Sequence, residues 1–106
     1  MIKAIIKITT VFALSLLIQG CAVASDEMIG EQIYKAYCAG CHGIEGQGNR
    51  TCPSFTKDKE RLAKSDDELL LSIKNGKGYM PPYKRMFSDE DILRVIGYLR
   101  NTFGYD

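Results

Sequence analysis

The residues best suited to chemistry in this chain form one short run, Cys38-Ala39-Gly40-Cys41-His42. A C-x-x-C-H run is the attachment signature of a c-type haem. The two thiols lie three residues apart on one helical turn, where they can add to the two vinyl groups of the porphyrin as thioethers. The imidazole of the next residue then reaches the iron as its proximal ligand. The run therefore predicts one haem c, bound covalently through Cys38 and Cys41, with His42 on the iron.

Two other interpretations of the same cysteines are possible. A C-x-x-C pair can be a thioredoxin-like redox centre, but that requires a strand–helix context, and no βαβ pattern surrounds this pair. Together with Cys52, the run could supply a Cys₃His zinc site. Against zinc, Cys41 and His42 are adjacent and poorly placed to share one tetrahedral ion, and the second half of a zinc pattern is missing.

A six-coordinate iron needs a second axial ligand, and the chain offers few. It contains one histidine in all, so bis-histidine ligation within the chain is excluded and methionine is the remaining common partner. Met28 precedes the attachment run, and Met86 can equally be core filler beside Phe87. Met80 lies between Gly76 and Pro82 in a loop that glycine and proline stiffen, which can hold a thioether across the far haem face. Met80 is the preferred ligand, with a role as a loop-anchoring hydrophobe as its alternative.

Residues 1–24 have the features of a cleaved export signal. Lys3 and Lys7 give a positive start, residues 8–18 are mostly apolar, and Ala22-Val23-Ala24 matches an A-x-A cleavage site. The apolar run is too short for a good stop-transfer helix. We therefore expect a periplasmic protein with one domain, residues 25–106.

A competing pattern lies in the same segment. Leu17-Ile18-Gln19-Gly20-Cys21 resembles the lipobox of bacterial lipoproteins, in which the cysteine is lipidated and becomes the new N-terminus. A domain anchored at Cys21 would sit almost on the bilayer. We expect soluble export, with membrane attachment only if Cys21 is lipidated.

The net charge limits which classes of partner the chain can be expected to bind. The chain has 14 Lys and Arg against 13 Asp and Glu, and the signal removes two lysines, so the mature chain is near neutral. This argues against nucleic acid, which favours a strong basic excess. Several basic residues fall in segments expected to flank the haem, where they would form a rim that steers an acidic redox partner; scattered solubilising charge is the other interpretation. They are Lys57, Lys59, Lys74, Lys77, Lys84 and Arg85.

The expected first helix runs from Asp26 to Tyr37 and leads into the cysteine run. Its apolar stripe, spaced every four residues, is Ile29, Ile33 and Tyr37. Glycines and a proline over residues 43–53 predict a loop whose backbone can lie close to a flat cofactor. Residues 57–63 are charged and are predicted to form a short helix.

Two further helices have clear start signals. Ser65 and Glu68 form a capping box for one of them, which ends at Gly76. Its predicted buried face is Leu69, Leu70 and Ile73. The last helix starts at Ser88 with an acidic first turn. Its predicted inner face is Ile92, Val95, Ile96 and Leu99. No strand pattern of useful length and no internal repeat is found, so the predicted fold is all-α.

Over nearly all of residues 26–103 the chain resembles the small bacterial class I monohaem c-type cytochromes. The matching segments are Cys38 to His42, Gly43 through Pro53, Met80-Pro81-Pro82-Tyr83 and Ser88 to Asp91. The resemblance implies three main helices and a short one wrapped round one covalent haem, with the first and last helices packed together. The residues it implies at that contact are Gly30, Tyr34, Val95 and Tyr98. It also implies that the Pro53 carbonyl accepts the His42 Nδ1–H bond. Cys52, just before Pro53, departs from the family pattern.

With His42 and Met80 on both sides of the iron, no site is open for a substrate. We therefore expect a monomeric electron carrier, not an enzyme, that cycles between ferric and ferrous haem with donor and acceptor redox proteins. Two alternatives are a haem-c subunit of a periplasmic oxidoreductase and, if Met80 is displaced, a protein that binds a small gas or peroxide. Cys52 is left as an odd thiol, either a small buried hydrophobe or the site of an intermolecular disulfide.

Overall fold

Six helical segments follow one another along residues 24–104, the part of the chain that the computed structural model describes. They are α2 (Asp26–Ile33), η3 (Tyr34–Cys38), α3 (Ala39–His42), η4 (Lys59–Arg61), α4 (Asp66–Asn75) and α5 (Asp89–Phe103). Within this range there is no strand, which agrees with the all-α prediction. None of the helices in residues 24–104 combines the length and the apolar character that a membrane span requires. The expected export signal and Cys21 lie outside the described residues.

The first three segments form one continuous helical stretch that ends at His42. It begins at Ser25, whose hydroxyl accepts a hydrogen bond from the Met28 N–H at 3.2 Å. At Tyr34–Cys38 the stretch widens into a π-helical turn, a feature that is frequent at functional sites. The predicted helix is therefore present, but it continues past Tyr37 and through the cysteine run.

The predicted apolar stripe of this helix is wrong in register. Gly30 and Tyr34 are its buried positions, whereas Ile29 and Ile33 are half-buried and Tyr37 is exposed. The reason is the close approach of α5 at Gly30, which centres the packed face on Gly30 and Tyr34 and leaves Ile33 at its edge.

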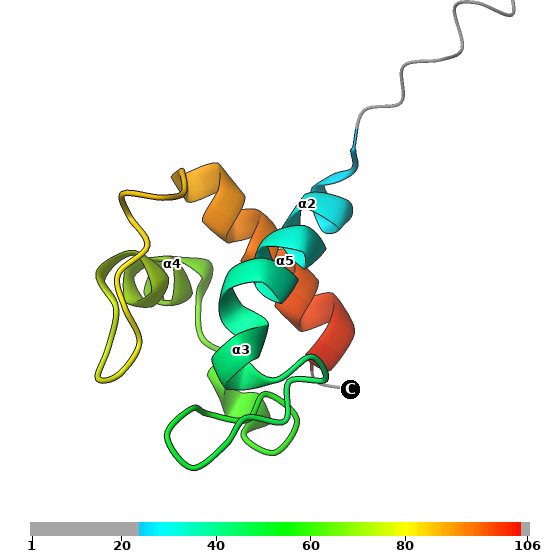
Figure 1. Ribbon diagram of the computed structural model, residues 1–106. Helices are drawn as coiled ribbons and strands as arrows, with labels where there is room; N and C mark the ends of the chain where they lie inside the picture. Colours follow the sequence, from blue (N-terminus) through cyan, green and yellow to red (C-terminus); the bar gives the residue numbers. More distant parts are fainter. Residues whose placement is uncertain (1–23, 105–106) are drawn as a thin grey trace, which may run out of the picture.

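The contact between α2 and α5 is the centre of the fold (Figure 1). A Cβ on Gly30 would collide with the backbone carbonyl of Arg94 and lie 3.0 Å from the Tyr98 Cβ. The Tyr34 and Tyr98 rings pack at 5.5 Å between centroids, and Val95 is buried in the same cluster. This is the helix pairing that the resemblance implied.

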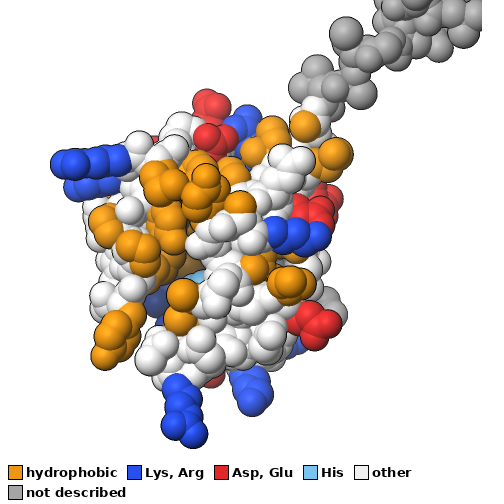
Figure 2. Space-filling model, in the orientation of Figure 1, with side chains coloured by type: hydrophobic (Ala, Val, Ile, Leu, Met, Phe, Trp, Pro, Cys, Tyr) orange, Lys and Arg blue, Asp and Glu red, His pale blue; other side chains and the backbone are white. Residues whose placement is uncertain are grey.

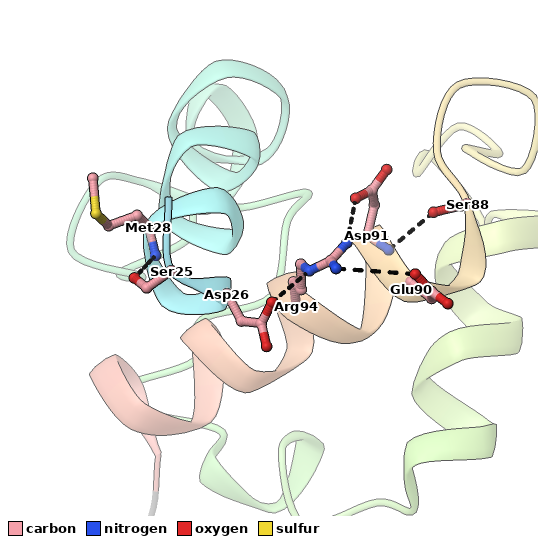
Figure 3. A network of polar contacts seen from close by, with 7 residues as sticks. All are labelled: Ser25, Asp26, Met28, Ser88, Glu90, Asp91 and Arg94. Atoms are coloured by element: carbon pink, nitrogen blue, oxygen red, sulfur yellow. Dashed lines mark hydrogen bonds and ion pairs between the residues drawn. The ribbon is translucent and has the colours of Figure 1, made fainter. Parts of the chain in front are cut away.

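A surface network fastens the same two helices near the start of α2 (Figure 3). The Arg94 guanidinium lies 2.9 Å from Asp26 Oδ1 and 2.9 Å from Asp91 Oδ1, with Glu90 at 3.9 Å. Asp26 is mostly exposed, so each pair stabilises little by itself. The network fixes Arg94 against the first turn of α2.

The start of α4 has the predicted capping box. Ser65 Oγ accepts from the Glu68 N–H at 3.2 Å, and Glu68 Oε2 accepts from the Ser65 N–H at 3.3 Å. Arg100 of α5 binds Asp66 of α4. These local and surface contacts fix where α4 starts and how it meets α5.

The predicted face of α4 is only half-buried, because no residue of α4 is fully buried. Leu69, Leu70 and Ile73 are half-buried, and Leu71 is exposed. α4 packs on α5 along part of its surface and leaves the rest of its apolar residues open, beside the yellow segment in Figure 1.

The last helix forms as predicted, whereas the segment before α4 is shorter than predicted. Ser88 caps α5 by accepting from the Asp91 N–H at 3.2 Å, and the predicted inner residues Ile92, Val95, Ile96 and Leu99 are all buried. The predicted helix over residues 57–63 is only the single 3₁₀ turn of η4.

Candidate haem site

The two cysteines of the C-x-x-C-H run come from adjoining helical turns. Cys38 ends the π-helical turn, is half-buried and packs against the core, whereas Cys41 in α3 is exposed. Burial, with a smaller contribution from the nearby Cys41, raises the pKa of the Cys38 thiol to about 11. Both thiols stand one helical turn apart on the same stretch, as attachment to one porphyrin requires.

The His42 ring is oriented by two contacts. Its Nδ1 lies 3.0 Å from the Pro53 carbonyl oxygen, the contact that the resemblance implied. Because a carbonyl can only accept, Nδ1 carries the proton and Nε2 keeps a free lone pair for a metal. Phe55 stacks on the imidazole at 4.5 Å between centroids. Phe55 was not predicted from the sequence, and the only available signal was its place two residues after Pro53.

The backbone on both sides of His42 is also held. The Tyr34 hydroxyl donates to the Gly43 carbonyl at 2.6 Å, and the Gly48 N–H donates to the His42 carbonyl at 2.6 Å. Burial raises the pKa of Tyr34 well above its usual value, so its phenol stays a donor. These bonds fix the end of α3, from which the imidazole projects.

The glycines of residues 43–53 serve close backbone packing. Gly48 has φ +68°, and a Cβ there would collide with the backbone of Cys52 and Pro53. A Cβ on Gly46 would lie 3.0 Å from the Phe103 ring. Within the described residues these glycines let the loop fold on itself and on α5, which brings Pro53 under His42.

Met80 sits in a tight turn within a loop that we call the Met80 loop, residues 76–87. The N–H of Lys77 donates to the Met80 carbonyl at 3.1 Å, and the N–H of Met80 donates to the Lys77 carbonyl at 3.0 Å. Gly76 adopts φ +74°, and a Cβ there would collide with the Met80 carbonyl. Met80 is half-buried, whereas Met28 and Met86 are 51% and 55% exposed.

The Met80 loop is tied to the helix that carries the cysteines. The Tyr83 hydroxyl donates to the Tyr37 carbonyl at 3.1 Å, and the Tyr83 N–H donates to the Ile73 carbonyl at 3.1 Å. Phe87 packs edge-on against the Tyr37 ring at 5.0 Å. Tyr37 was predicted to face the core, and no structural role was predicted for Tyr83. The only available signal was an aromatic residue beside the proline pair.

The residues present fit a large apolar group. Apolar side chains remain exposed on the π-helical turn, on α4 and in the Met80 loop. They are Tyr37, Leu71, Tyr79 and Met86. Figure 2 shows hydrophobic side chains gathered around a hollow on one face of the molecule. Two thiols, a free imidazole Nε2 and a thioether are the donor set of a haem c with two axial ligands.

The residues do not fit the alternative of a zinc site. Among residues 24–104 there is no group of three or more His, Cys, Asp or Glu side chains arranged to hold a metal ion. The tetrahedral set that the Cys₃His zinc alternative requires is therefore absent from that range.

The fold and the site define a class: a small helical protein whose open apolar face, paired thiols and oriented imidazole suit a covalent haem.

Comparison with known proteins agrees with this class. Residues 25–99 match the family model described as cytochrome c oxidase, cbb3-type, subunit III. Cytochrome c6 of Pyropia yezoensis is 33% identical over 82 residues, covering 74% of this chain and 73% of the relative. Cytochrome c6 of Diacronema lutheri is 28% identical over 78 residues, covering 71% and 94%.

Solved structures have the same fold. Cytochrome c6 from the diatom Phaeodactylum tricornutum superposes with a TM-score of 0.58 at 33% identity and covers 71% of this chain and 91% of its own. The KustC0563 c-type cytochrome gives 0.62 at 22% identity, covering 72% and 98%, which supports the fold alone. The chain belongs to the c-type cytochrome family, as a class I cytochrome with one haem. It is a small electron-transfer protein that carries one covalently bound haem c.

Proposed function

We propose that this chain is a periplasmic electron carrier whose haem is attached through Cys38 and Cys41, with His42 and Met80 as the axial ligands. The observation that carries the ligand assignment is the 3.0 Å contact between His42 Nδ1 and the Pro53 carbonyl oxygen. It leaves Nε2 as the nitrogen that can bind iron, beside the two thiols. The half-burial of Met80, against the exposure of Met28 and Met86, supports the second ligand.

The bound haem supplies one-electron chemistry, and the residues of the chain hold its geometry. The bond from His42 Nδ1–H to Pro53 fixes the ring and raises its basicity. Tyr83 and Phe87 fasten the Met80 loop to the helix of the cysteines. With both axial positions filled, no substrate reaches the iron, so we propose no enzymatic activity.

The ligand assignment is tested by replacing Met80 with alanine in the haem-loaded protein. Met80→Ala is expected to abolish the weak near-infrared sulfur-to-iron band of the ferric form and to make the ferrous form CO-reactive, because the iron loses its sulfur ligand. Met86→Ala, at an exposed methionine of the same loop, is the matched control and should keep both properties. An unchanged band in Met80→Ala would refute the assignment.

Export and processing are a separate part of the proposal. The charged start, apolar stretch and A-x-A pattern support removal of residues 1–24, which leaves the cytochrome domain at 25–106. Mass spectrometry of the mature protein is expected to find Ser25 at the N-terminus. A diacylglyceryl group on Cys21 would contradict soluble export.

Docking is proposed to involve the basic residues near the haem. Residues 77–87 contain Lys77, Lys84 and Arg85 and no acidic residue. In the described part of the chain none of these three forms an ion pair, whereas Lys74 pairs with Asp89 at 2.9 Å. An uncompensated basic loop around Met80 supports steering of an acidic donor or acceptor protein.

A second candidate function is favoured by the name of the matching family model, cytochrome c oxidase, cbb3-type, subunit III. In this alternative the domain moves electrons as a fixed subunit of an oxidoreductase. Purification without detergent separates the two: a carrier elutes alone, and a subunit elutes with its partners or stays with the membrane.

A further inference from the structure

The Met80 loop is joined to the helical stretch that carries the cysteines by one side-chain hydroxyl. The Tyr83 hydroxyl donates to the Tyr37 carbonyl at 3.1 Å. Among the residues that the structure describes, this is the only hydrogen bond between the Met80 loop and residues 26–42. Tyr37 directly precedes Cys38, so the bond joins the loop to the point where the first thioether is expected.

The ring and backbone of Tyr83 have contacts of their own, apart from the hydroxyl. The Tyr83 N–H donates to the Ile73 carbonyl at 3.1 Å, at the end of α4. The Phe87 ring lies 6.2 Å from the Tyr83 ring and 5.0 Å from the Tyr37 ring, measured between centroids. Removal of the hydroxyl alone therefore leaves the packing of the loop on α4 and on Phe87 in place.

The segment between Met80 and Tyr83 is stiff because it consists of two prolines. Pro81 and Pro82 have φ fixed at about −65°, and a residue that precedes a proline is restricted to extended conformations. A displacement of Tyr83 is therefore passed on to Met80. On its other side, Met80 is closed into a turn with Lys77 by two backbone hydrogen bonds of 3.0 and 3.1 Å. Met80 thus lies between two points of attachment, and Tyr83 is the one that reaches the helix of the cysteines.

We propose that Tyr83 is a positioning residue, whose hydroxyl keeps the Met80 thioether on the iron by holding the Met80 loop closed against the helix of the cysteines. The inference rests on the proposed ligation by Met80. An external ligand reaches the iron from this side only when the loop opens and Met80 leaves, so its apparent affinity is reduced by the small fraction of open molecules. One hydrogen bond changes such an equilibrium by a factor of about two to ten. Loss of the Tyr83 hydroxyl should raise the open fraction by that factor.

Titration of the ferric, haem-loaded protein with imidazole measures this opening. Imidazole displaces Met80 and removes the weak near-infrared sulfur-to-iron band, so the loss of the band reports the apparent affinity. Tyr83→Phe keeps the ring and is expected to bind imidazole about twofold to tenfold more tightly than the parent protein. Its band without imidazole should be unchanged. Tyr79→Phe, at a side chain of the same loop that is 86% exposed, is the matched control and should bind imidazole as the parent protein does.

A second pair of variants separates the positioning of Met80 from a general loosening of the loop. In Met80→Ala the iron has no sulfur ligand to lose, so the addition of Tyr83→Phe should leave the imidazole affinity unchanged. The shift of the main visible absorption band follows binding in these two proteins. An equal increase in affinity with and without Met80 would show that the hydroxyl controls access to the haem and not the hold on the thioether, which would overturn the proposal.

The titration also keeps the two proposals apart. If the parent protein shows the sulfur band and Tyr83→Phe binds imidazole with the parent's affinity, the role of Tyr83 is refuted and ligation by Met80 stands. If the parent protein lacks the band, ligation by Met80 is refuted, and the role of Tyr83 is refuted with it.

Discussion

At the scale of single residues, Tyr34 links the core to the haem site. Its ring is fully buried between Tyr98 and Phe103, and its hydroxyl donates to the carbonyl of Gly43, next to His42. Burial is the main cause that raises its pKa above the usual value of about 10. The side chain therefore contributes packing, a hydrogen bond and a pH dependence of stability.

Tyr34→Phe is expected to lower the free energy of unfolding by about 1 kcal/mol, because it keeps the ring but leaves the Gly43 carbonyl without this donor. The parent protein should also lose stability as the pH rises above about 10. The unfolded chain then releases the phenol proton while the folded chain keeps it, so unfolding becomes more favourable. Tyr34→Phe should lose this part of the alkaline dependence.

Urea unfolding at pH 7 and at pH 10.5 measures both effects. Tyr79→Phe, at a side chain that is 86% exposed, is the control and should behave as the parent protein. Equal alkaline slopes in Tyr34→Phe and the parent protein would contradict the role given to this phenol.

What could be predicted at this scale depended on how local the signal was. The residue types and spacing of the two thiols and the imidazole in residues 38–42 are sufficient to predict haem attachment. The contact between Pro53 and His42 was predicted only through the family resemblance, and the contact of Phe55 with His42 was not predicted. The stacking of Phe55 on the imidazole depends on how residues 43–54 fold back, which no pattern within that loop encodes.

At the scale of elements, the α2–α5 crossing depends on the absence of a side chain at Gly30. A Cβ there meets backbone, the Arg94 carbonyl, and not the movable end of a side chain. The helices would have to separate, and the Tyr34–Tyr98 contact would be disturbed with them. A Cβ added to Gly97, on α5, would instead point into open space, with no neighbouring side chain or facing backbone within 4 Å.

Gly30→Ala is therefore expected to destabilise the protein, although alanine is the better helix former by about 1 kcal/mol. Overpacking of a tight contact costs about 1–3 kcal/mol or more, which outweighs that gain. Gly97→Ala is the matched control and should be neutral or up to about 1 kcal/mol stabilising. Thermal or urea unfolding of the haem-loaded proteins measures the difference, and equal stabilities for the two variants would refute the close-contact account.

The capping signals at Ser65 and Ser88 predicted where α4 and α5 begin, because a cap is made by residues three apart. The register of α2 and the burial of α4 were not predictable in the same way. Each depends on what packs against the helix. The register of α2 is set by the approach of α5 at Gly30, and the burial of α4 is incomplete because part of its apolar surface faces the hollow and not another helix. Periodicity shows that a helix has an apolar side, not which neighbour covers it.

At the scale of the whole molecule, charge is unevenly distributed over a nearly neutral chain. The first turns of α2, α4 and α5 are acidic, whereas residues 77–87 carry three basic side chains and no acidic one. A neutral protein can therefore present a positive field at the loop that holds Met80. Surface charges act over about 10 Å at 0.1 M salt, so these three basic side chains act mainly on reagents that approach the Met80 loop itself.

Small redox reagents of opposite charge test this field without knowledge of the natural partner. Oxidation of the ferrous protein by ferricyanide, an anion, is expected to slow as salt is added, and oxidation by a cationic cobalt complex to quicken. Replacing Lys77, Lys84 and Arg85 by glutamine should slow the ferricyanide reaction at low salt, by about tenfold within the range of known steering effects, and flatten both salt dependences. Lys35→Gln, at a lysine already paired with Glu31 at 2.7 Å, is the control for a single lost charge and should change the rate less than Lys84→Gln. If the triple variant keeps the parent's salt dependence with both reagents, electrons do not leave through the Met80 side and the basic residues there serve solubility alone.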